Sequence, residues 1–139
     1  MKQAQHTLTI RTGGQGLTEV TDQVVPWVAE QGIGTGMLTV YIRHTSASLV
    51  IQENADPDVM RDLETFFKQL VREDPSLYRH KTEGPDDMPA HIKGALTQTS
   101  LNIPVSDGRL ALGTWQGIYL FEHRTRPYKR ELVLHLMGE

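Results

Sequence analysis

Apolar and polar residues alternate along several stretches of the chain, a pattern typical of half-buried β-strands. The first such stretch, HTLTIRT, places Leu8 and Ile10 on one face. Comparable stretches follow: GMLTVYIR, SASLVIQE, TSLNIPV, LALGTWQGIYLFEHR and KRELVLHLMG. Asp107 and Gly108, which lie between two of them, are a typical hairpin turn pair. The alternation therefore predicts a largely antiparallel sheet system.

Two other stretches repeat their apolar residues at the spacing of an α-helix. In TEVTDQVVPWVAEQG the repeating residues are Val20, Val24 and Val28. Because Pro26 lies inside this stretch, we expect the regular helix to begin near Thr21 or to be kinked.

The second helical stretch, DPDVMRDLETFFKQLVRE, has the clearest signals. Asp56 suits the N-cap position and Pro57 suits the first helical position. Its apolar residues at helical spacing are Val59, Leu63, Phe66 and Leu70. A third, shorter helix, PAHIKGALTQ, is expected to begin at Pro89.

The order of these elements predicts an α+β fold with a largely antiparallel sheet system, two main helices and one short helix. With 139 residues, the chain is long enough to bury a core as a single domain over residues 1–139. A small sheet with open edges often completes its core by forming oligomers.

Composition narrows the functional classes. A formal net charge of −3 gives no overall attraction to nucleic acid or to an anionic membrane. No apolar run approaches the roughly 20 residues that span a bilayer, and the N-terminal stretch resembles a strand rather than a signal peptide. We therefore expect a cytoplasmic protein with no nucleic-acid or membrane partner. The absence of cysteine means that any metal must be held by His, Asp or Glu.

The stretch HKTEGPDDMPAHI is rich in ligands for metals and protons. It holds His80 and His91, with Glu83, Asp86 and Asp87 between them. If a helix begins at Pro89, then Asp87 and His91 reach toward one point in space. The alternative is a solvated loop in which Asp87 merely favours the positive end of the helix.

A second polar cluster, HTSASL, places His44, Thr45, Ser46 and Ser48 at the end of an apolar strand. Small hydroxyl groups at such a place suit an anion such as phosphate. The same alternation is also ordinary for the exposed face of a strand, so the pattern leaves both interpretations open.

A third stretch, GTWQGIYLFEHR, has glycines within a strand-like pattern, which often marks a bulge or the close approach of a ligand. Trp115 then forms the floor of an aromatic pocket, or packs in a core or an interface. If Glu122 points inward, it needs a cation or a metal as partner. Four cationic residues follow closely: Arg124, Arg126, Lys129 and Arg130. Such a cluster could bind phosphate groups, but an exposed loop would show the same pattern.

Four motifs in this order, HTSASL, QENADPDV, EGPDDMPAHIK and GRLALGTWQGIYLFEHR, closely resemble the YjbQ-like family over nearly the whole chain. The resemblance implies an α+β fold of two packed sheets (a two-sheet β-sandwich), a homotrimer, a cytoplasmic location and a weak, secondary thiamine-phosphate synthase activity. The family's polar signature falls on His44, Thr45, Ser46, Glu53, Asn54, Asp56, His80, Glu83, Asp86, Asp87, His91, Trp115, Gln116, Glu122, Arg124 and Arg130. Gln52 departs from the family pattern, outside this set.

From this resemblance we expect a metal-dependent enzyme that joins a pyrimidine pyrophosphate to a thiazole phosphate. The expected metal ligands are His44, His80 and His91, with Asp87 as a fourth ligand or their partner. The expected substrate contacts are Thr45, Ser46, Ser48, Asn54, Trp115, Gln116 and Arg124. Glu53, Asp87 and Glu122 are the expected catalytic carboxylates, which orient an imidazole or move a proton.

The metal and the reaction class stay open at this point. Three histidines suit zinc, whereas magnesium, which prefers oxygen ligands, would arrive with a pyrophosphate substrate. A histidine centre also suits metal-assisted hydrolysis of another phosphorylated molecule. The alternative function is a non-catalytic trimer that binds a metal or a phosphorylated metabolite.

Overall fold

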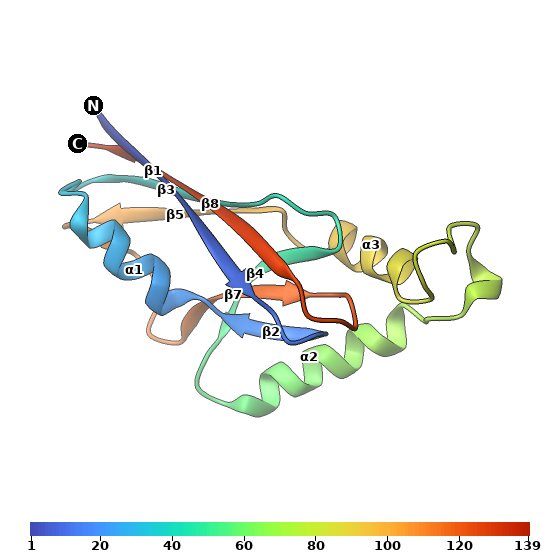
Figure 1. Ribbon diagram of the computed structural model, residues 1–139. Coiled ribbons are helices and arrows are strands. Elements are labelled where there is room, and N and C mark those ends of the chain that lie inside the picture. The colour runs from blue at the N-terminus through green and yellow to red at the C-terminus, as the bar shows by residue number, and fades with distance from the viewer.

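The strand and helix patterns of the sequence become two sheets and three α-helices in the computed structural model, which describes residues 1–139 (Figure 1). The strands are β1 (Lys2–Arg11), β2 (Gly16–Glu19), β3 (Gly36–Ile42), β4 (Ala47–Glu53), β5 (Ser100–Ser106), β6 (Arg109–Leu110), β7 (Gln116–Glu122) and β8 (Lys129–Gly138). The helices are α1 (Thr21–Glu30), α2 (Pro57–Leu70) and α3 (Asp87–Leu96), with a short 3₁₀ helix, η1 (Pro75–Leu77), between α2 and α3.

Both sheets are antiparallel. The larger sheet has five strands in the order β1-β8-β3-β5-β6, and the smaller has three in the order β2-β7-β4. The predicted α+β fold with largely antiparallel sheets is therefore confirmed. The turn between β5 and β6 is also as predicted, because Asp107 and Gly108 both have the positive φ angles that a tight hairpin requires.

The core lies between the two sheets, where strand alternation directs apolar side chains inward. Along β8, for example, Leu132, Leu134 and Leu136 are fully buried while the residues between them are partly accessible. The core cluster contains 18 buried residues, including Val24 and Val28 from α1. Helix α1 begins at Thr21, as expected, and continues through Pro26 to Glu30.

Helix α2 runs along the outside of the smaller sheet, below β2 and β7 in Figure 1. It has the predicted start, because the side chain of Asp56 accepts a hydrogen bond from the backbone N–H of Asp58 and Pro57 follows the cap. No residue of α2 is fully buried, however, and Phe66 and Leu70 are each 55% exposed. The apolar spacing thus identified the helix but not a deeply buried face.

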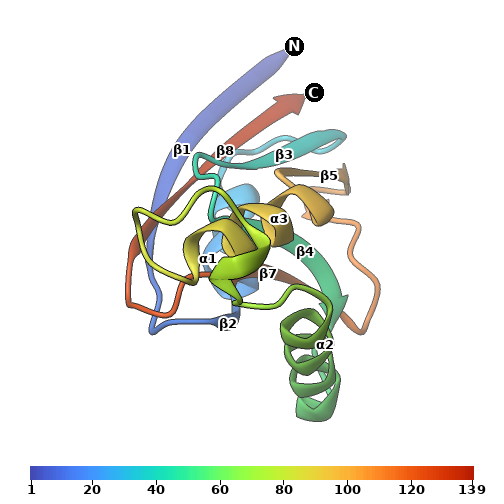
Figure 2. The same cartoon turned by 90° about the vertical axis from the view of Figure 1, so that its right-hand side faces the viewer.

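Helix α3 lies at the end of the molecule, next to β4 (Figures 1 and 2). It begins at Asp87, two residues before the predicted start, because a proline such as Pro89 is tolerated within the first turn. The N- and C-terminal strands β1 and β8 pair along their whole length, so both termini lie together (Figure 1). No helix has the length and apolar character needed to cross a membrane.

Candidate metal centre

Three candidate ligands converge at the start of α3. Asp87 and His91 lie one helical turn apart and therefore face the same side of the helix. The Oδ2 atom of Asp87 is 2.6 Å from Nε2 of His80 and 3.1 Å from Nε2 of His91. One ligand atom from each residue lies within 4.8 Å of the other two. The structure thus brings together two of the three predicted histidine ligands and the predicted carboxylate.

The hydrogen bonds around His91 set the direction of its Nε2 atom. Its Nδ1 lies 3.2 Å from the backbone carbonyl of Thr45, which only accepts hydrogen bonds, so Nδ1 carries the hydrogen. Nε2 then faces Oδ2 of Asp87, to which it donates a hydrogen bond in the metal-free chain, and a metal bound there would replace this proton. This arrangement, a ligand histidine oriented by a carbonyl on its far nitrogen, is common at protein metal sites.

Arg124 holds the carboxylates of the centre in place. Its guanidinium donates from Nε to Oδ2 of Asp86 at 2.9 Å and from NH1 to Oδ1 of Asp87 at 2.8 Å. It also donates to the backbone carbonyl of Glu83. Arg124 was predicted to contact phosphate, but here its donors serve these acceptors. Because Oδ1 of Asp87 is used by Arg124, Oδ2 is the oxygen left for a metal.

Both carboxylates are ionised at neutral pH. Burial is the largest single influence on the pKa of Asp86 and raises it, but hydrogen bonds from Arg124 and the backbone of Thr125 outweigh it and lower the pKa to about 2. For Asp87 burial likewise opposes ionisation, and the hydrogen bond with His80 and the charges of His91 and Arg124 hold its pKa below the ordinary value. Two imidazole nitrogens and one carboxylate oxygen suit zinc or another divalent transition metal, and three protein ligands leave a coordination position for water or substrate.

His44 does not belong to this group, although it was predicted to be a ligand. Its Nε2 accepts a hydrogen bond from the backbone N–H of Glu131 at 2.9 Å, and its Nδ1 faces Arg130 at 3.5 Å. Burial, followed by the charge of Arg130, lowers the pKa of His44. Both ring nitrogens are therefore engaged with neighbours other than the centre.

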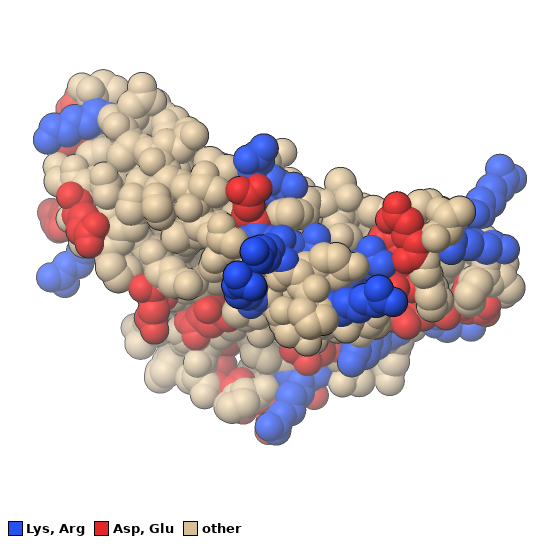
Figure 3. Space-filling view, viewed as in Figure 1, with Lys and Arg blue, Asp and Glu red and all other residues tan.

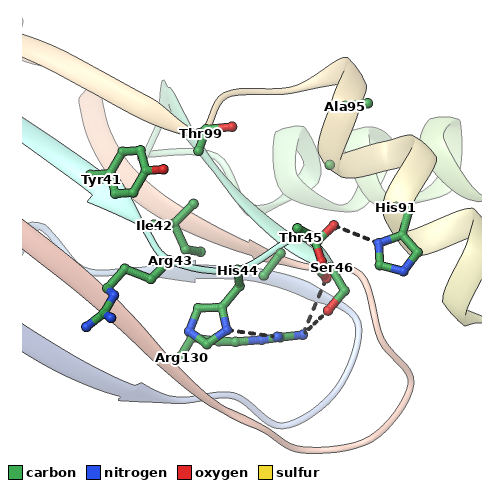
Figure 4. A pocket seen from close by; sticks show the side chains of 12 residues that line it. Tyr41, Ile42, Arg43, His44, Thr45, Ser46, His91, Ala95, Thr99 and Arg130 are labelled. Atoms are coloured by element: carbon green, nitrogen blue, oxygen red, sulfur yellow. Dashed lines mark hydrogen bonds between the residues drawn. The ribbon is translucent and has the colours of Figure 1, made fainter. Parts of the chain in front are cut away.

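An open pocket of about 790 Å³ lies directly beside the centre (Figure 4). His91 and His44 both line it, together with Arg43, Thr45, Ser46 and Thr99. Figure 4 shows Thr45 between the two histidines, with its backbone turned toward His91. The HTSASL motif thus forms one wall of this pocket, and donors from side chains are available there to an anionic ligand.

Glu122 points inward and has the cationic partner that an inward carboxylate needs. Arg130 donates to both of its oxygens, and the hydroxyl of Thr12 donates to Oε1 at 2.7 Å. The side chains of Glu122 and Arg130 are 0% and 5% exposed. Arg130 also holds the hydroxyl of Ser46 at 3.0 Å. Glu122, a predicted catalytic residue, is thus part of a closed ion pair behind the pocket wall.

Ser48 is likewise buried rather than presented to a ligand. Its hydroxyl lies 2.8 Å from Nε2 of His123 and accepts a hydrogen bond from the hydroxyl of Thr97, directly after α3. His123 is 1% exposed and its Nδ1 has no hydrogen-bond partner. Burial, with the nearby charges of Lys93 and Arg130, lowers the pKa of His123 to about 3. His123 is therefore neutral at physiological pH.

The remaining predicted residues lie at those ends of β4 and β7 that are far from the metal centre. Glu53 and Gln116 are cross-strand partners there, and the backbone N–H of Asn54 donates to the carbonyl of Trp115. The ends of β4 are about 20 Å apart at the usual rise of a strand. Within one chain, Glu53, Asn54, Trp115 and Gln116 are therefore not brought to the centre. Trp115 is 62% exposed, so it does not form the floor of a pocket in the isolated chain.

Some residues that support the site gave no signal in the sequence. Thr12 belongs to an unremarkable strand end, and Thr125 to the loop after β7. Tyr128 lies under the guanidinium of Arg130, 4.7 Å from ring centroid to Cζ. Each acts through strand pairing or loop packing with residues far along the chain, which residue spacing does not encode.

Comparisons with known proteins agree with the motifs. A family model described as UPF0047 protein YjbQ-like matches residues 6–139. A UPF0047 protein from Synechocystis sp. is 56% identical over 99% of this chain and 94% of its own length, and the UPF0047 protein YjbQ of Escherichia coli O157:H7 is 43% identical over 97% and 98%. A crystal structure of a hypothetical protein from Aeropyrum pernix K1 has a TM-score of 0.89 at 31% identity, covering 98% of this chain and 99% of that one.

Proposed function

This chain belongs to the UPF0047 family of YjbQ-like proteins, and from that premise we propose that it is a metal-dependent enzyme acting on phosphorylated small molecules. The observation that carries the proposal is the convergence of His80, Asp87 and His91 beside an open pocket with several side-chain donors. A divalent ion bound there would supply Lewis acidity toward a phosphoryl oxygen or a water molecule.

The protein's own residues have three roles in this proposal. Asp87, whose pKa is held low by His80, His91 and Arg124, balances part of the charge of the ion. In the pocket, Arg43 and the hydroxyls of Thr45 and Thr99 donate hydrogen bonds to phosphate oxygens. Lys and Arg side chains also gather where β1 ends and β8 begins (Figure 3), and Arg11 and Lys129 are cross-strand partners there. This local positive charge attracts an anionic substrate despite the net charge of the chain.

The more specific form of the proposal is a thiamine-phosphate synthase-like transfer. A ring nitrogen of the thiazole phosphate forms a C–N bond to the methylene carbon of the pyrimidine pyrophosphate, and the C–O bond to pyrophosphate breaks. The negative charge that leaves with pyrophosphate needs cations, which the pocket supplies in part. We propose zinc as the resident metal, while magnesium, an oxygen-preferring ion, accompanies the pyrophosphate.

One observation favours the alternative of a non-catalytic binding protein. Glu122 is locked in an ion pair with Arg130, and Glu53 lies at the far end of β4, so neither carboxylate is free to move a proton at the centre. A protein that holds a metal and a phosphorylated metabolite needs the ligands and donors but no such group. The two functions predict the same binding and differ only in turnover.

We also propose that the chain forms a homotrimer, as the family resemblance implies. What supports this is the division of the predicted site between the two ends of β4 and β7. Assembly of identical chains would allow Trp115 and Asn54 of one subunit to approach the pocket of a neighbour. Light scattering coupled to size exclusion tests it: a molar mass three times that of the chain is expected, and a monomer would contradict it.

Metal content tests the centre directly. Mass spectrometry of the purified protein is expected to find one zinc or other transition-metal ion per chain, and none in the His80→Ala/His91→Ala double variant. The control is His6→Ala/His135→Ala, which removes two histidines outside the centre and is expected to keep the metal. Circular dichroism checks that both variants remain folded. A wild-type protein that stays metal-free after reconstitution would refute the metal proposal.

Turnover separates the two functions. Metal-loaded protein is incubated with phosphorylated small molecules, including the pyrimidine pyrophosphate and thiazole phosphate pair, and released phosphate or pyrophosphate is measured. Release that depends on His80 and His91 supports the enzyme. Saturable binding with no release above the double variant supports the binding protein instead.

A further inference from the structure

Helix α3 and the connection between β3 and β4 approach each other closely at Gly94. A Cβ atom at this position would lie 2.9 Å from the carbonyl oxygen of Thr45 and 3.7 Å from its carbonyl carbon. Gly94 has no positive φ angle, so its backbone does not require glycine. Alanine is normally preferred to glycine inside a helix. The absence of a side chain is therefore explained by the close approach of this carbonyl.

The Thr45 carbonyl, which comes close to α3 because Gly94 has no side chain, also orients His91. Thr45 accepts the hydrogen bond from Nδ1 of His91 at 3.2 Å, and this directs Nε2 to Oδ2 of Asp87 at 3.1 Å. Gly94 and His91 lie three residues apart on α3, so both face the 43–46 connection. A methyl group at Gly94 would thus act on the same carbonyl as His91.

The 43–46 connection has little freedom to move away from the helix. The carbonyl of Ser46 accepts hydrogen bonds from the backbone N–H of His123 at 3.2 Å and from Arg130 at 3.4 Å. Arg130 is itself fixed by the buried ion pair with Glu122. An added methyl group must therefore tilt α3 or rotate the Thr45 carbonyl, and either change weakens its bond to His91.

We propose that Gly94 is a positioning residue of the metal centre, which fixes the tautomer and orientation of His91 through the Thr45 carbonyl. The link from Gly94 to His91 concerns this chain alone. Its consequence for metal affinity rests on the proposed function. Partners that orient a ligand histidine typically change metal affinity by about 10- to 100-fold when they are lost.

The first test reads the tautomer of His91 in metal-free protein by long-range ¹H–¹⁵N correlation spectra. In the wild type we expect a proton on Nδ1, bonded to the Thr45 carbonyl. In Gly94→Ala we expect a substantial population in which Nδ1 carries no proton and only Nε2, which faces Asp87, is protonated. Gly13→Ala is the matched control, since a Cβ at Gly13 would meet nothing within 4 Å. A wild-type His91 whose Nδ1 carries no proton would by itself overturn the proposal, whether or not the variant folds.

The second test measures zinc affinity by competition with a chelator, next to thermal unfolding of the metal-free proteins. Gly94→Ala is expected to raise the dissociation constant by about 10- to 100-fold while its helix remains intact. Gly13→Ala is expected to bind as the wild type does. Wild-type affinity and tautomer in Gly94→Ala would refute the proposal. A tautomer change in a protein that never binds metal would support the link and refute only the metal function.

Discussion

The polar residues around the centre divide their hydrogen-bonding atoms between two tasks. Asp87 gives one oxygen to Arg124 and the other to the histidines, while His91 gives one nitrogen to a carbonyl and the other to Asp87, where a metal could replace its proton. Glu122, in contrast, accepts hydrogen bonds from Arg130 and Thr12 with both of its oxygens. The first arrangement leaves ligand atoms available, whereas the second is closed and serves stability.

The variant Glu122→Gln tests this distinction. It leaves the guanidinium of Arg130 buried without a counter-charge, which is expected to lower the free energy of unfolding by about 3–5 kcal/mol in urea denaturation. The control Asp58→Asn removes a carboxylate whose partner Arg61 is largely exposed, and we expect no measurable change there. Equal, small losses for both variants would show that the Glu122 pair does not support the fold.

For individual residues of the site, the sequence predicted correctly those contacts that join residues close together along the chain. His80, Asp87 and His91 lie within twelve positions, so one loop and one helical turn suffice to bring them together. Thr12 and Glu122, by contrast, are 110 residues apart and meet only through the pairing of four different strands. His44 was assigned to the centre from the family resemblance, and its neighbours Glu131 and Arg130 come from a strand whose partner the sequence did not reveal.

Among the elements, α2 shows how far helical spacing can be interpreted. Capping by Asp56 and the apolar repeat predicted the helix correctly, because both depend on neighbours along the chain. How deeply the apolar face of α2 is buried depends on the part of the smaller sheet that it packs against. The small sheet offers α2 one main aromatic contact, where Phe67 meets Phe121 edge to face at 5.3 Å between ring centroids.

This contact predicts that two adjacent phenylalanines have different effects on stability. Phe67→Ala removes the ring that packs on Phe121 and is expected to cost about 2 kcal/mol, somewhat less than truncation of a fully buried ring. Phe66→Ala, at a 55% exposed side chain, is expected to cost less than about 0.5 kcal/mol. Urea denaturation of both variants measures the difference. A larger loss for Phe66 would mean that its ring is covered in the assembled protein.

For the molecule as a whole, strand alternation predicted an antiparallel sheet system and the family resemblance implied two sheets, but neither predicted the strand order. In the five-stranded sheet β3 lies between β8 and β5, so sequence neighbours β3 and β4 belong to different sheets. That separation places the connection 43–46 against α3 and the buried His123 between β4 and α3. The pocket beside the centre results from this strand order. Because the sequence did not predict the order, it identified residues of the pocket singly and did not show that they line one surface.

His123 makes the stability of the whole fold depend on pH. Its pKa is about 3 in the folded protein, against about 6.5 in the unfolded chain, so unfolding favours uptake of a proton between these values. The stabilisation is fully present above pH 6.5 and is lost as pH falls toward 3, by at most about 1.4 kcal/mol per pH unit. Asp86, with a pKa of about 2, adds a loss in the same direction only below about pH 4.

The interval from pH 7 to pH 4.5 therefore avoids the contribution of Asp86, and a variant separates His123 from His44, whose pKa is also lowered. Urea denaturation of the metal-free protein is expected to lose more stability over this interval in the wild type than in His123→Gln, by about 2 kcal/mol. The glutamine keeps a donor and an acceptor near Ser48 but does not titrate. Parallel pH profiles for the two proteins would mean that His123 becomes protonated within the folded state, which requires water to reach its unpartnered Nδ1.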